Sequence, residues 1–298
     1  MPPSPRKKMY MPRVFPVRCG ALLAALLVAG TTRAAPPSPP GPPREQVATV
    51  LDQHIHYVEA GRGQPVILLH GLGATKETWL PSFGALAARY HVYAIDQIGF
   101  GRSDKPHLDY KIATFVDFLH GFLVAQNLAK VTLVGNSLGG WIAMEFAIQH
   151  PDMMDRLVLV DSAGLTFLHP SPVDLNPSSL AATRAVMEAL FYDKKLVTEP
   201  IVRQVFADHL RNNDGYTIQR TFAGFATPQF VDAKLGSIRA PTLIVWGRED
   251  VLLPLASGEK LRDGIAGAKL VVFDQCGHIP HVEKPAEFTR AVLEFLGK

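Results

Sequence analysis

Apolar and polar residues follow two different periods along the chain. Short, almost continuous apolar runs predict buried strands over residues 65–70, 91–96, 131–136, 156–161, 241–246 and 269–274. Residues 54–60 alternate between apolar and polar and predict a further strand. Apolar residues at helical spacing predict helices over 77–89, 112–128, 138–149 and 286–297. Strands that alternate with helices predict an α/β fold, in which a mostly parallel sheet is flanked by helices.

One interval interrupts this alternation. Residues 164–236 carry no strong strand pattern; they begin with the proline-rich stretch "HPSPVDLNPSS" and continue with helical patterns around 179–192 and 199–213. We therefore predict that residues 164–236 form a helical cap over the carboxyl edge of the sheet. The core then comprises residues 47–163 and 237–298.

The first residues differ in composition from the rest of the chain. A basic start precedes the apolar block "GALLAALLVAG" at 20–30, and the small residues of "TTRAA" follow. This order is typical of a secretory signal peptide, so residues 1–35 are predicted to be removed on export to a secreted or periplasmic location. The block is too short to cross a bilayer comfortably, so we expect no stable membrane span in the mature chain. An uncleaved N-terminus is the alternative, and residues 36–46 are predicted to be a proline-rich spacer.

Composition and charge narrow the classes of partner. The chain has 298 residues, 47% of them hydrophobic, which suits one large domain. Its formal charge is +3, but residues 1–35 hold six Lys or Arg and no acid. Removing these six from the 30 basic residues leaves 24 against 27 acidic ones, so neither nucleic acid nor an anionic membrane is an expected partner. The histidines show no metal-ligand spacing, and we expect neither a metal nor another cofactor.

A serine in the stretch "VTLVGNSLGGW" is the first candidate for chemistry. Ser137 lies between Gly135 and Gly139, after a predicted strand and before a predicted helix. This G-x-S-x-G pattern is typical of a sharp turn that holds a serine out above a sheet. A serine hydroxyl is a weak nucleophile at neutral pH, so it needs a base and a group that orients the base.

The partners of Ser137 are expected on loops that follow later strands. His278 follows the strand at 269–274 and is the predicted base, whereas His281 is expected either to support the catalytic residues from behind or to lie at the surface. Asp250 follows the strand at 241–246 and is predicted to orient the imidazole. Asp161 is the competitor for this role, and Glu249 is a weaker one.

Backbone N–H groups are expected to bind the oxyanion that forms when the serine attacks. Leu138 supplies one at a helix N-terminus, and Leu72 in "HGLG" is predicted to supply the other. His70 is interpreted as structural, through hydrogen bonds to nearby loops.

Other conspicuous residues have two interpretations each. Trp79, Asn136, Trp141 and Phe100 are candidates for the substrate pocket, although aromatic side chains of this kind are more often core or lid packing. Cys276 is interpreted as a small buried filler, with a reactive thiol as the alternative.

Taken together, the motifs "HGLG", "DQIGFGRSDKP", "GNSLGG", "GRED" and "GHIPHVEKP" resemble those of the α/β-hydrolase superfamily over residues 52–298. The resemblance is to its serine esterase and lipase branch. It implies hydrolysis of a small-molecule carboxylic ester through an acyl enzyme, without a cofactor. The serine disfavours epoxide hydrolases and haloalkane dehalogenases of this fold, which use an aspartate nucleophile.

A second resemblance leaves an alternative activity open. "GNSLGGWIAMEFAIQHPD", "LFYDKKLVTEPIVRQVF" and "CGH" are also similar to the meta-cleavage-product hydrolases, which cut carbon–carbon bonds in dienoic acids. Those enzymes have a cap arginine and a tryptophan after the histidine. Here Val205, with Arg203 nearby, and Ile279 stand at those positions. A cofactor-free perhydrolase and a non-catalytic binding protein of the same fold are further alternatives.

Overall fold

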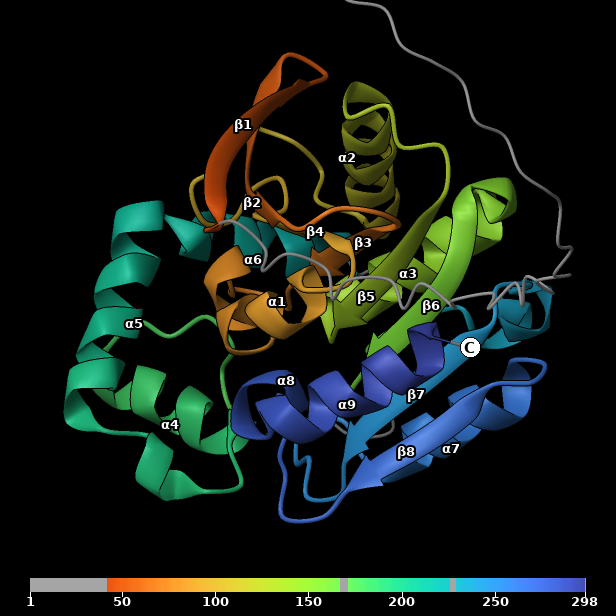
Figure 1. The fold of residues 1–298 in the computed structure, drawn as a ribbon. Coiled ribbons are helices and arrows are strands. Elements are labelled where there is room, and N and C mark those ends of the chain that lie inside the picture. The colour runs from red at the N-terminus through yellow and green to blue at the C-terminus, as the bar shows by residue number, and fades with distance from the viewer. Residues whose placement is uncertain (1–41, 167–170, 226–228, 298) are drawn as a thin grey trace, which may run out of the picture. The chain divides into compact units, whose positions relative to one another are not determined.

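The central feature of the fold is an eight-stranded sheet (Figure 1). The computed structural model describes residues 42–166, 171–225 and 229–297. Its strands are β1 (Arg44–Val50), β2 (Gln53–Ala60), β3 (Pro65–Leu69), β4 (His91–Ile95), β5 (Val131–Asn136), β6 (Met154–Val160), β7 (Thr242–Gly247) and β8 (Lys269–Phe273). The predicted signal peptide, residues 1–35, lies outside the described residues. The predicted spacer 36–46 needs a correction at its end, because β1 already begins at Arg44.

The order of the strands creates a point where loops diverge at the carboxyl edge. The order is β1-β2-β4-β3-β5-β6-β7-β8; β1 pairs with β2 and β2 with β4 antiparallel, and the other pairs are parallel. After β3 the chain adds β4 on one side and then returns to add β5 on the other. Ligands of open α/β sheets bind at such switch points.

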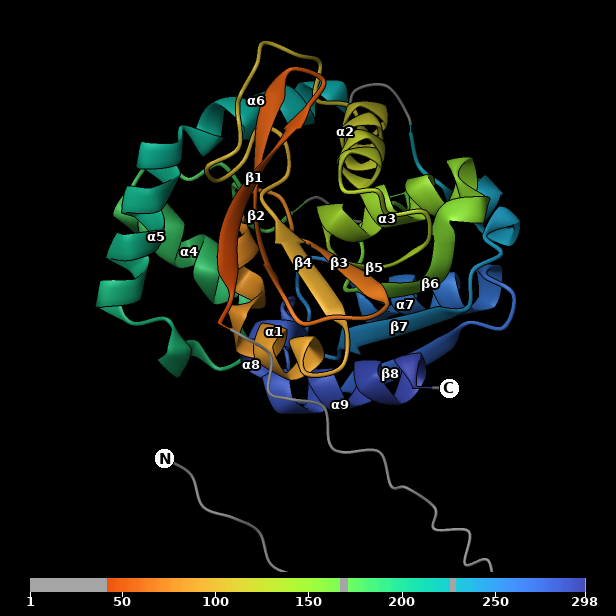
Figure 2. The ribbon, with the colours of Figure 1, turned by 45° about the horizontal axis from the view of Figure 1, so that its top comes forward.

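Helices cover both faces of the sheet (Figure 2). One face carries α1 (Leu80–Ala87), α8 (Pro280–Glu283) and α9 (Pro285–Leu296), and the other carries α2 (Ile112–Ala125), α3 (Leu138–Gln149) and α7 (Leu255–Gly264). Each face has its own apolar cluster, and every residue of β5 is buried between them. The prediction of a mostly parallel sheet flanked by helices is therefore confirmed.

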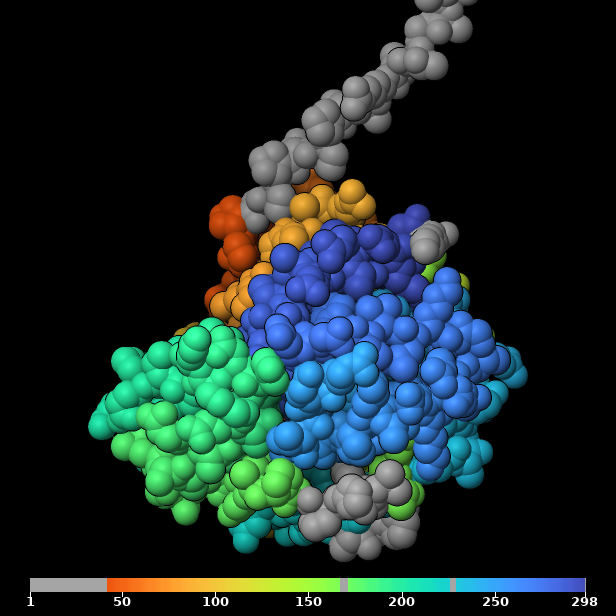
Figure 3. All heavy atoms as spheres, turned by 90° about the horizontal axis from the view of Figure 1, so that it is seen from below, coloured from red at the N-terminus to blue at the C-terminus, as the bar shows by residue number. Residues whose placement is uncertain are grey.

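Between β6 and β7, the described part of the chain forms helices that lie against carboxyl-edge loops. They are α4 (Leu180–Leu190), α5 (Glu199–Asn212), α6 (Asp214–Gly224) and the short 3-10 helices η3 (Lys194–Leu196) and η4 (Asp232–Ser237). Hydrogen bonds join Leu190 O to the loop after β8 and Asp214 to the loop after β4. In Figure 3 the cap residues, in green, lie beside the C-terminal part of the core, in blue.

The sequence analysis missed the short helix α8, and it missed β1, α6 and α7 because their apolar patterns are weak. β1 is an edge strand that leaves Val47 49% exposed, so its apolar pattern is weak. In α7 only Gly258 and Leu261 are buried, and α6 buries mainly small or polar side chains. The parts of the chain described by the structure contain no helix long and apolar enough to span a membrane.

Candidate functional site

The turn that carries Ser137 is strained and tightly packed. Ser137 follows β5 and precedes α3, with φ 53° and ψ −116°, in the region that side chains rarely adopt. A Cβ atom at Gly135 would lie 2.3 Å from Gly139 O, and one at Gly139 would lie 2.2 Å from Leu69 O. The Ser137 N–H donates to Val160 O over 3.0 Å. Only glycine on both sides lets the helix begin this close to the sheet.

His278 lies on the loop after β8 and is paired with Asp250. The His278 Nδ1 to Asp250 Oδ2 distance is 2.7 Å, and both side chains are buried. The other Asp250 oxygen, Oδ1, accepts hydrogen bonds from the backbone N–H groups of Leu252 (2.8 Å) and Leu253 (3.0 Å). A carboxyl group held in this way keeps the imidazole in one orientation, with Nδ1 toward Asp250, and His278 lines the cavity beside Ser137.

Asp161 and Glu249, the alternatives to Asp250 as the residue that orients His278, make other hydrogen bonds. Asp161 is close to the pair, but its Oδ1 accepts from the Gly247 N–H (2.9 Å). Glu249 Oε2 accepts from the Cys276 N–H (3.0 Å). The hydrogen bond from His278 Nδ1 therefore goes to Asp250.

Asn136 and Glu283 anchor the histidine loop. Asn136 Nδ2 donates to His278 O (3.0 Å) and to Val160 O (3.1 Å), so Asn136 supports the loop and is not among the cavity-lining residues. This corrects the expectation of a pocket residue. The Glu283 carboxylate accepts from the N–H groups of Gly277, Tyr192 and Asp193. Sequence reasoning missed Glu283, although it lies within the quoted "GHIPHVEKP".

The loop after β3 approaches Ser137 closely. A Cβ atom at Gly71 would lie 3.3 Å from the Ser137 Cβ, so Leu72 is next to the serine turn. Leu138 is the first residue of α3, and its N–H has no acceptor within the helix. Both leucines line the same cavity as Ser137.

His70 fixes the loop after β3. The Gln97 N–H donates to His70 Nε2 (3.1 Å), so Nδ1 carries the proton and donates to Gly71 O (2.8 Å). Burial lowers the pKa of His70 and favours this neutral form. The interpretation of His70 as structural agrees with these contacts.

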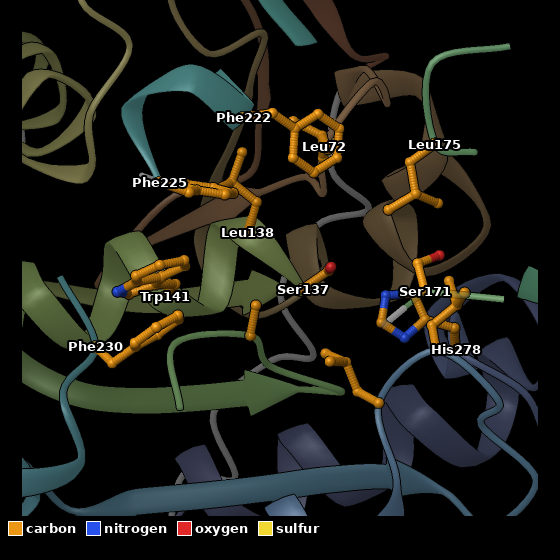
Figure 4. A pocket seen from close by; sticks show the side chains of 13 residues that line it. Leu72, Ser137, Leu138, Trp141, Ser171, Leu175, Phe222, Phe225, Phe230 and His278 are labelled. Carbon is orange, nitrogen blue, oxygen red and sulfur yellow. The ribbon is translucent and has the colours of Figure 1, made fainter. Parts of the chain in front are cut away.

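A cavity of about 470 Å³ opens above Ser137. Its described lining residues are Leu72, Ser137, Leu138, Trp141, Ala163, Ser171, Leu175, Phe222, Phe225, Phe230, Leu252, Leu253 and His278. Figure 4 shows Ser137 and His278 facing this space, with Trp141 and Phe230 on the far side from His278. The Trp141 ring stacks on Phe230 (centroids 5.3 Å apart). Apart from His278, no ionisable side chain is among the described lining residues.

Two predicted pocket residues belong to the core. Trp79 packs under α9, with its ring 4.0 Å from that of His281, and Phe100 packs on His70 and Phe115. Neither lines the cavity, which corrects the expectation for both. His281 is buried, not at the surface, and desolvation lowers its pKa to about 3.

Cys276 and the group formed by Asp161, Asp250 and His278 lie close to the catalytic residues. Cys276 is fully buried, and burial raises the pKa of its thiol, so the side chain is a packed filler. One atom each of Asp161, Asp250 and His278 lies within 4.8 Å of the others, a spacing that also suits a cation. However, His278 Nδ1 and both Asp250 oxygens are already engaged in hydrogen bonds.

The fold and the site define a hydrolase of the α/β type, and comparison with known proteins identifies the family. Residues 66–291 match the alpha/beta hydrolase family, and the chain belongs to it. One relative is 33% identical over 263 residues, covering 81% of this chain and 91% of its own: the 2-hydroxy-6-oxo-6-phenylhexa-2,4-dienoate hydrolase of Comamonas testosteroni.

Solved structures of two kinds are similar to this one. A meta-cleavage product hydrolase from Pseudomonas fluorescens has a TM-score of 0.77 at 30% identity, with 85% of this chain and 97% of that chain covered. A membrane phospholipase A has a TM-score of 0.79 at 28% identity, with 86% of each chain covered.

Proposed function

We propose that this hydrolase cleaves carboxylic esters with an apolar acyl or alcohol group, through an acyl enzyme on Ser137. The observation that carries the proposal is the cavity beside Ser137, whose lining is aromatic and aliphatic. Burial of apolar surface supplies the binding energy for such a substrate, on the order of 25 cal/mol per Å².

The groups beside Ser137 each take part in a step of this reaction, either by transferring a proton or by stabilising the oxyanion. His278 takes the proton of the Ser137 hydroxyl as the serine oxygen bonds to the ester carbonyl carbon. The oxyanion is stabilised by the N–H groups of Leu72 and Leu138. His278 then protonates the departing alcohol, and a water activated by His278 releases the acid and restores Ser137.

The charge of the cavity favours an ester over a dienoic acid. A dienoate substrate carries a carboxylate, and burial of an unpaired charge is costly. Val205, 41% exposed on α5, offers no charge, and Arg203 pairs with Glu199 (2.7 Å). Neither residue lines the cavity.

Hydrolysis of a carbon–carbon bond is the second candidate, and the relatives favour it. The relative from Comamonas testosteroni is named for a phenyl-substituted dienoate, and one of the similar structures is a meta-cleavage product hydrolase. The aromatic rings of Trp141, Phe225 and Phe230 suit a phenyl group as well as an acyl chain.

A substrate panel separates the two candidates. We expect hydrolysis of p-nitrophenyl esters of increasing chain length, and no turnover of a 6-phenyl dienoic acid under the same conditions. Ser137→Ala should lower the rate by about 10⁴-fold or more, because it removes the nucleophile. Turnover of the dienoic acid without ester hydrolysis would reverse the ranking, and an unaffected alanine variant would refute the role of Ser137.

A further inference from the structure

Asp161 is a buried carboxyl group that the proposed reaction does not use. It follows β6 directly, has φ 41°, and is fully buried. Its Oδ1 accepts from the Gly247 N–H, but Oδ2 is buried and meets no hydrogen-bond partner among the described residues. A buried carboxylate oxygen without a donor is costly, so its protonation state needs an explanation.

The neighbour of Asp161 is the carboxylate that orients His278. One carboxyl oxygen each of Asp161 and Asp250 and a ring nitrogen of His278 all lie within 4.8 Å of one another. Two buried carboxylates this close repel each other, so one of them holds a proton.

The hydrogen bonds decide which carboxyl group is neutral. Asp250 accepts from three donors, the N–H groups of Leu252 and Leu253 and Nδ1 of His278, which stabilise its ionised form. Asp161 accepts from one donor. A proton on Asp161 Oδ2 also turns this unpaired buried oxygen into a hydrogen-bond donor, for which the nearby Asp250 carboxylate is an acceptor.

We propose that Asp161 is a protonated positioning residue, whose carboxyl group donates a hydrogen bond to the Asp250 carboxylate and so holds Asp250 against His278. Burial, followed by the Asp250 charge, raises the pKa of Asp161 well above its usual range, in agreement with this assignment. The other titratable groups near Asp161 are His278, Glu283 and Cys276. The charge of Glu283 also raises the pKa of Asp161, whereas burial raises the pKa of the Cys276 thiol and keeps it neutral.

The donated hydrogen bond sets the basicity of the pair. It stabilises the ionised Asp250 and lowers the attraction of that carboxylate for a proton on His278. Loss of the bond should therefore make His278 more basic. The acid limb, which is the low-pH side of the plot of rate against pH, should then move to higher pH.

Infrared spectroscopy tests the protonation state directly. In the difference spectrum between the parent protein and Asp161→Asn near neutral pH, we expect the carbonyl stretch of a protonated carboxyl group. Asp214→Asn is the matched control, because Asp214 is the other buried aspartate with a raised pKa, about 7. Its band should titrate away above neutral pH, whereas the Asp161 band should remain. A parent minus Asp161→Asn spectrum without this band contradicts the proposal.

Kinetics tests the positioning role. This part rests on the proposed function, so the rate measured is that at which a neutral fluorophosphonate phosphonylates Ser137; Ser137 Oγ bonds to phosphorus, fluoride leaves, and the proton goes to His278. Asp161→Ala should lower this rate by roughly tenfold to a hundredfold and move the acid limb upward. Asp161→Asn, which keeps a hydrogen-bond donor, should restore most of the rate and return the acid limb to its position in the parent protein.

The outcomes separate the two proposals. If Asp161→Asn loses as much rate as Asp250→Asn, Asp161 is ionised and the proposal is wrong. An Asp161→Ala variant that folds by circular dichroism and keeps the parent's rate and pH profile also overturns it. A parent protein that is not labelled at Ser137 refutes the serine nucleophile instead, and the infrared result still decides the state of Asp161.

Discussion

At the scale of single residues, the serine turn depends on the absence of side chains. A Cβ atom would have no room at three glycines: Gly135 meets the backbone of α3, Gly139 meets the backbone of Leu69 at the end of β3, and Gly140 meets the side chain of Ser162. Ser137 itself has a strained backbone, which the surrounding hydrogen bonds maintain. The strain keeps the serine hydroxyl at the start of α3, beside the loop that carries Leu72.

A matched pair of glycine substitutions tests this dependence. Gly135→Ala should lower the free energy of unfolding by about 2–3 kcal/mol or more, because its Cβ would meet Gly139 O at 2.3 Å. Gly84→Ala, in the exposed part of α1, meets nothing within 4 Å and should stabilise the protein by about 0.5–1 kcal/mol. Urea unfolding followed by circular dichroism measures both. Equal effects of the two substitutions would contradict the packing argument.

At the scale of elements, the end of α4 and the histidine loop are joined. The His278 N–H donates to Leu190 O (2.8 Å). The Glu283 carboxylate accepts from backbone N–H groups of the segment after α4 and of the loop that carries His278. The cap and the base therefore form one hydrogen-bonded unit, in which a shift of α4 also shifts His278.

Substitution of Glu283 should loosen this unit. Glu283→Ala leaves three backbone N–H groups without their carboxylate, and we expect a loss of about 2 kcal/mol in unfolding free energy with a clear fall in kcat. Glu287→Ala is the control, because the Glu287 side chain is 48% exposed and its ion pair with Lys284 is long, at 3.8 Å. That change should stay within about 0.5 kcal/mol. A fall in stability without any change in kcat would show that Glu283 does not influence His278.

At the scale of the whole molecule, a buried aspartate joins the cap to the core. Asp214 at the start of α6 accepts from the Gly101 N–H (3.2 Å), and Lys105 Nζ lies 3.8 Å away. Burial raises the pKa of Asp214 to about 7, although Lys105 and Gly101 oppose the shift. The contact between α6 and the loop after β4 therefore changes its charge near neutral pH.

The sign of the resulting pH dependence follows from linkage. An unfolded aspartate titrates near pH 4, so the contribution of Asp214 to stability is full below about pH 4 and is lost as the pH rises through about 7. The stability of the parent relative to Asp214→Asn should therefore fall from about pH 5 to about pH 8. Chemical unfolding over this range measures the difference.

Asp232→Asn provides the control for this pH dependence. Burial opposes the ionisation of Asp232, but hydrogen bonds from Lys260 and Thr166 outweigh it and hold the pKa of Asp232 below its usual range. The contribution of Asp232 is thus lost only below about pH 4, and the difference from the parent should be flat between about pH 5 and about pH 8. A flat difference for Asp214→Asn as well would mean that Asp214 does not titrate in this range.

The sequence by itself determined the α/β class and the positions of Ser137, Asp250 and His278 after three of the strands, β5, β7 and β8. Strand and helix periods, and glycines at a sharp turn, are local properties, so they can be read without a structure. The strand β1 is exposed at the edge of the sheet, and the helices α6 and α7 bury few apolar groups, which leaves no clear period in the sequence.

Tertiary structure alone decided which residues share the site. Trp79 and Trp141 look alike in sequence, but opposite faces of the sheet bury them, and only Trp141 reaches the cavity. Asp161 and Asp250 are 89 positions apart, yet β6 and β7 pair side by side and bring their carboxyl groups together. Contacts of this kind depend on the order of strands in the sheet, which the local pattern of residues does not contain.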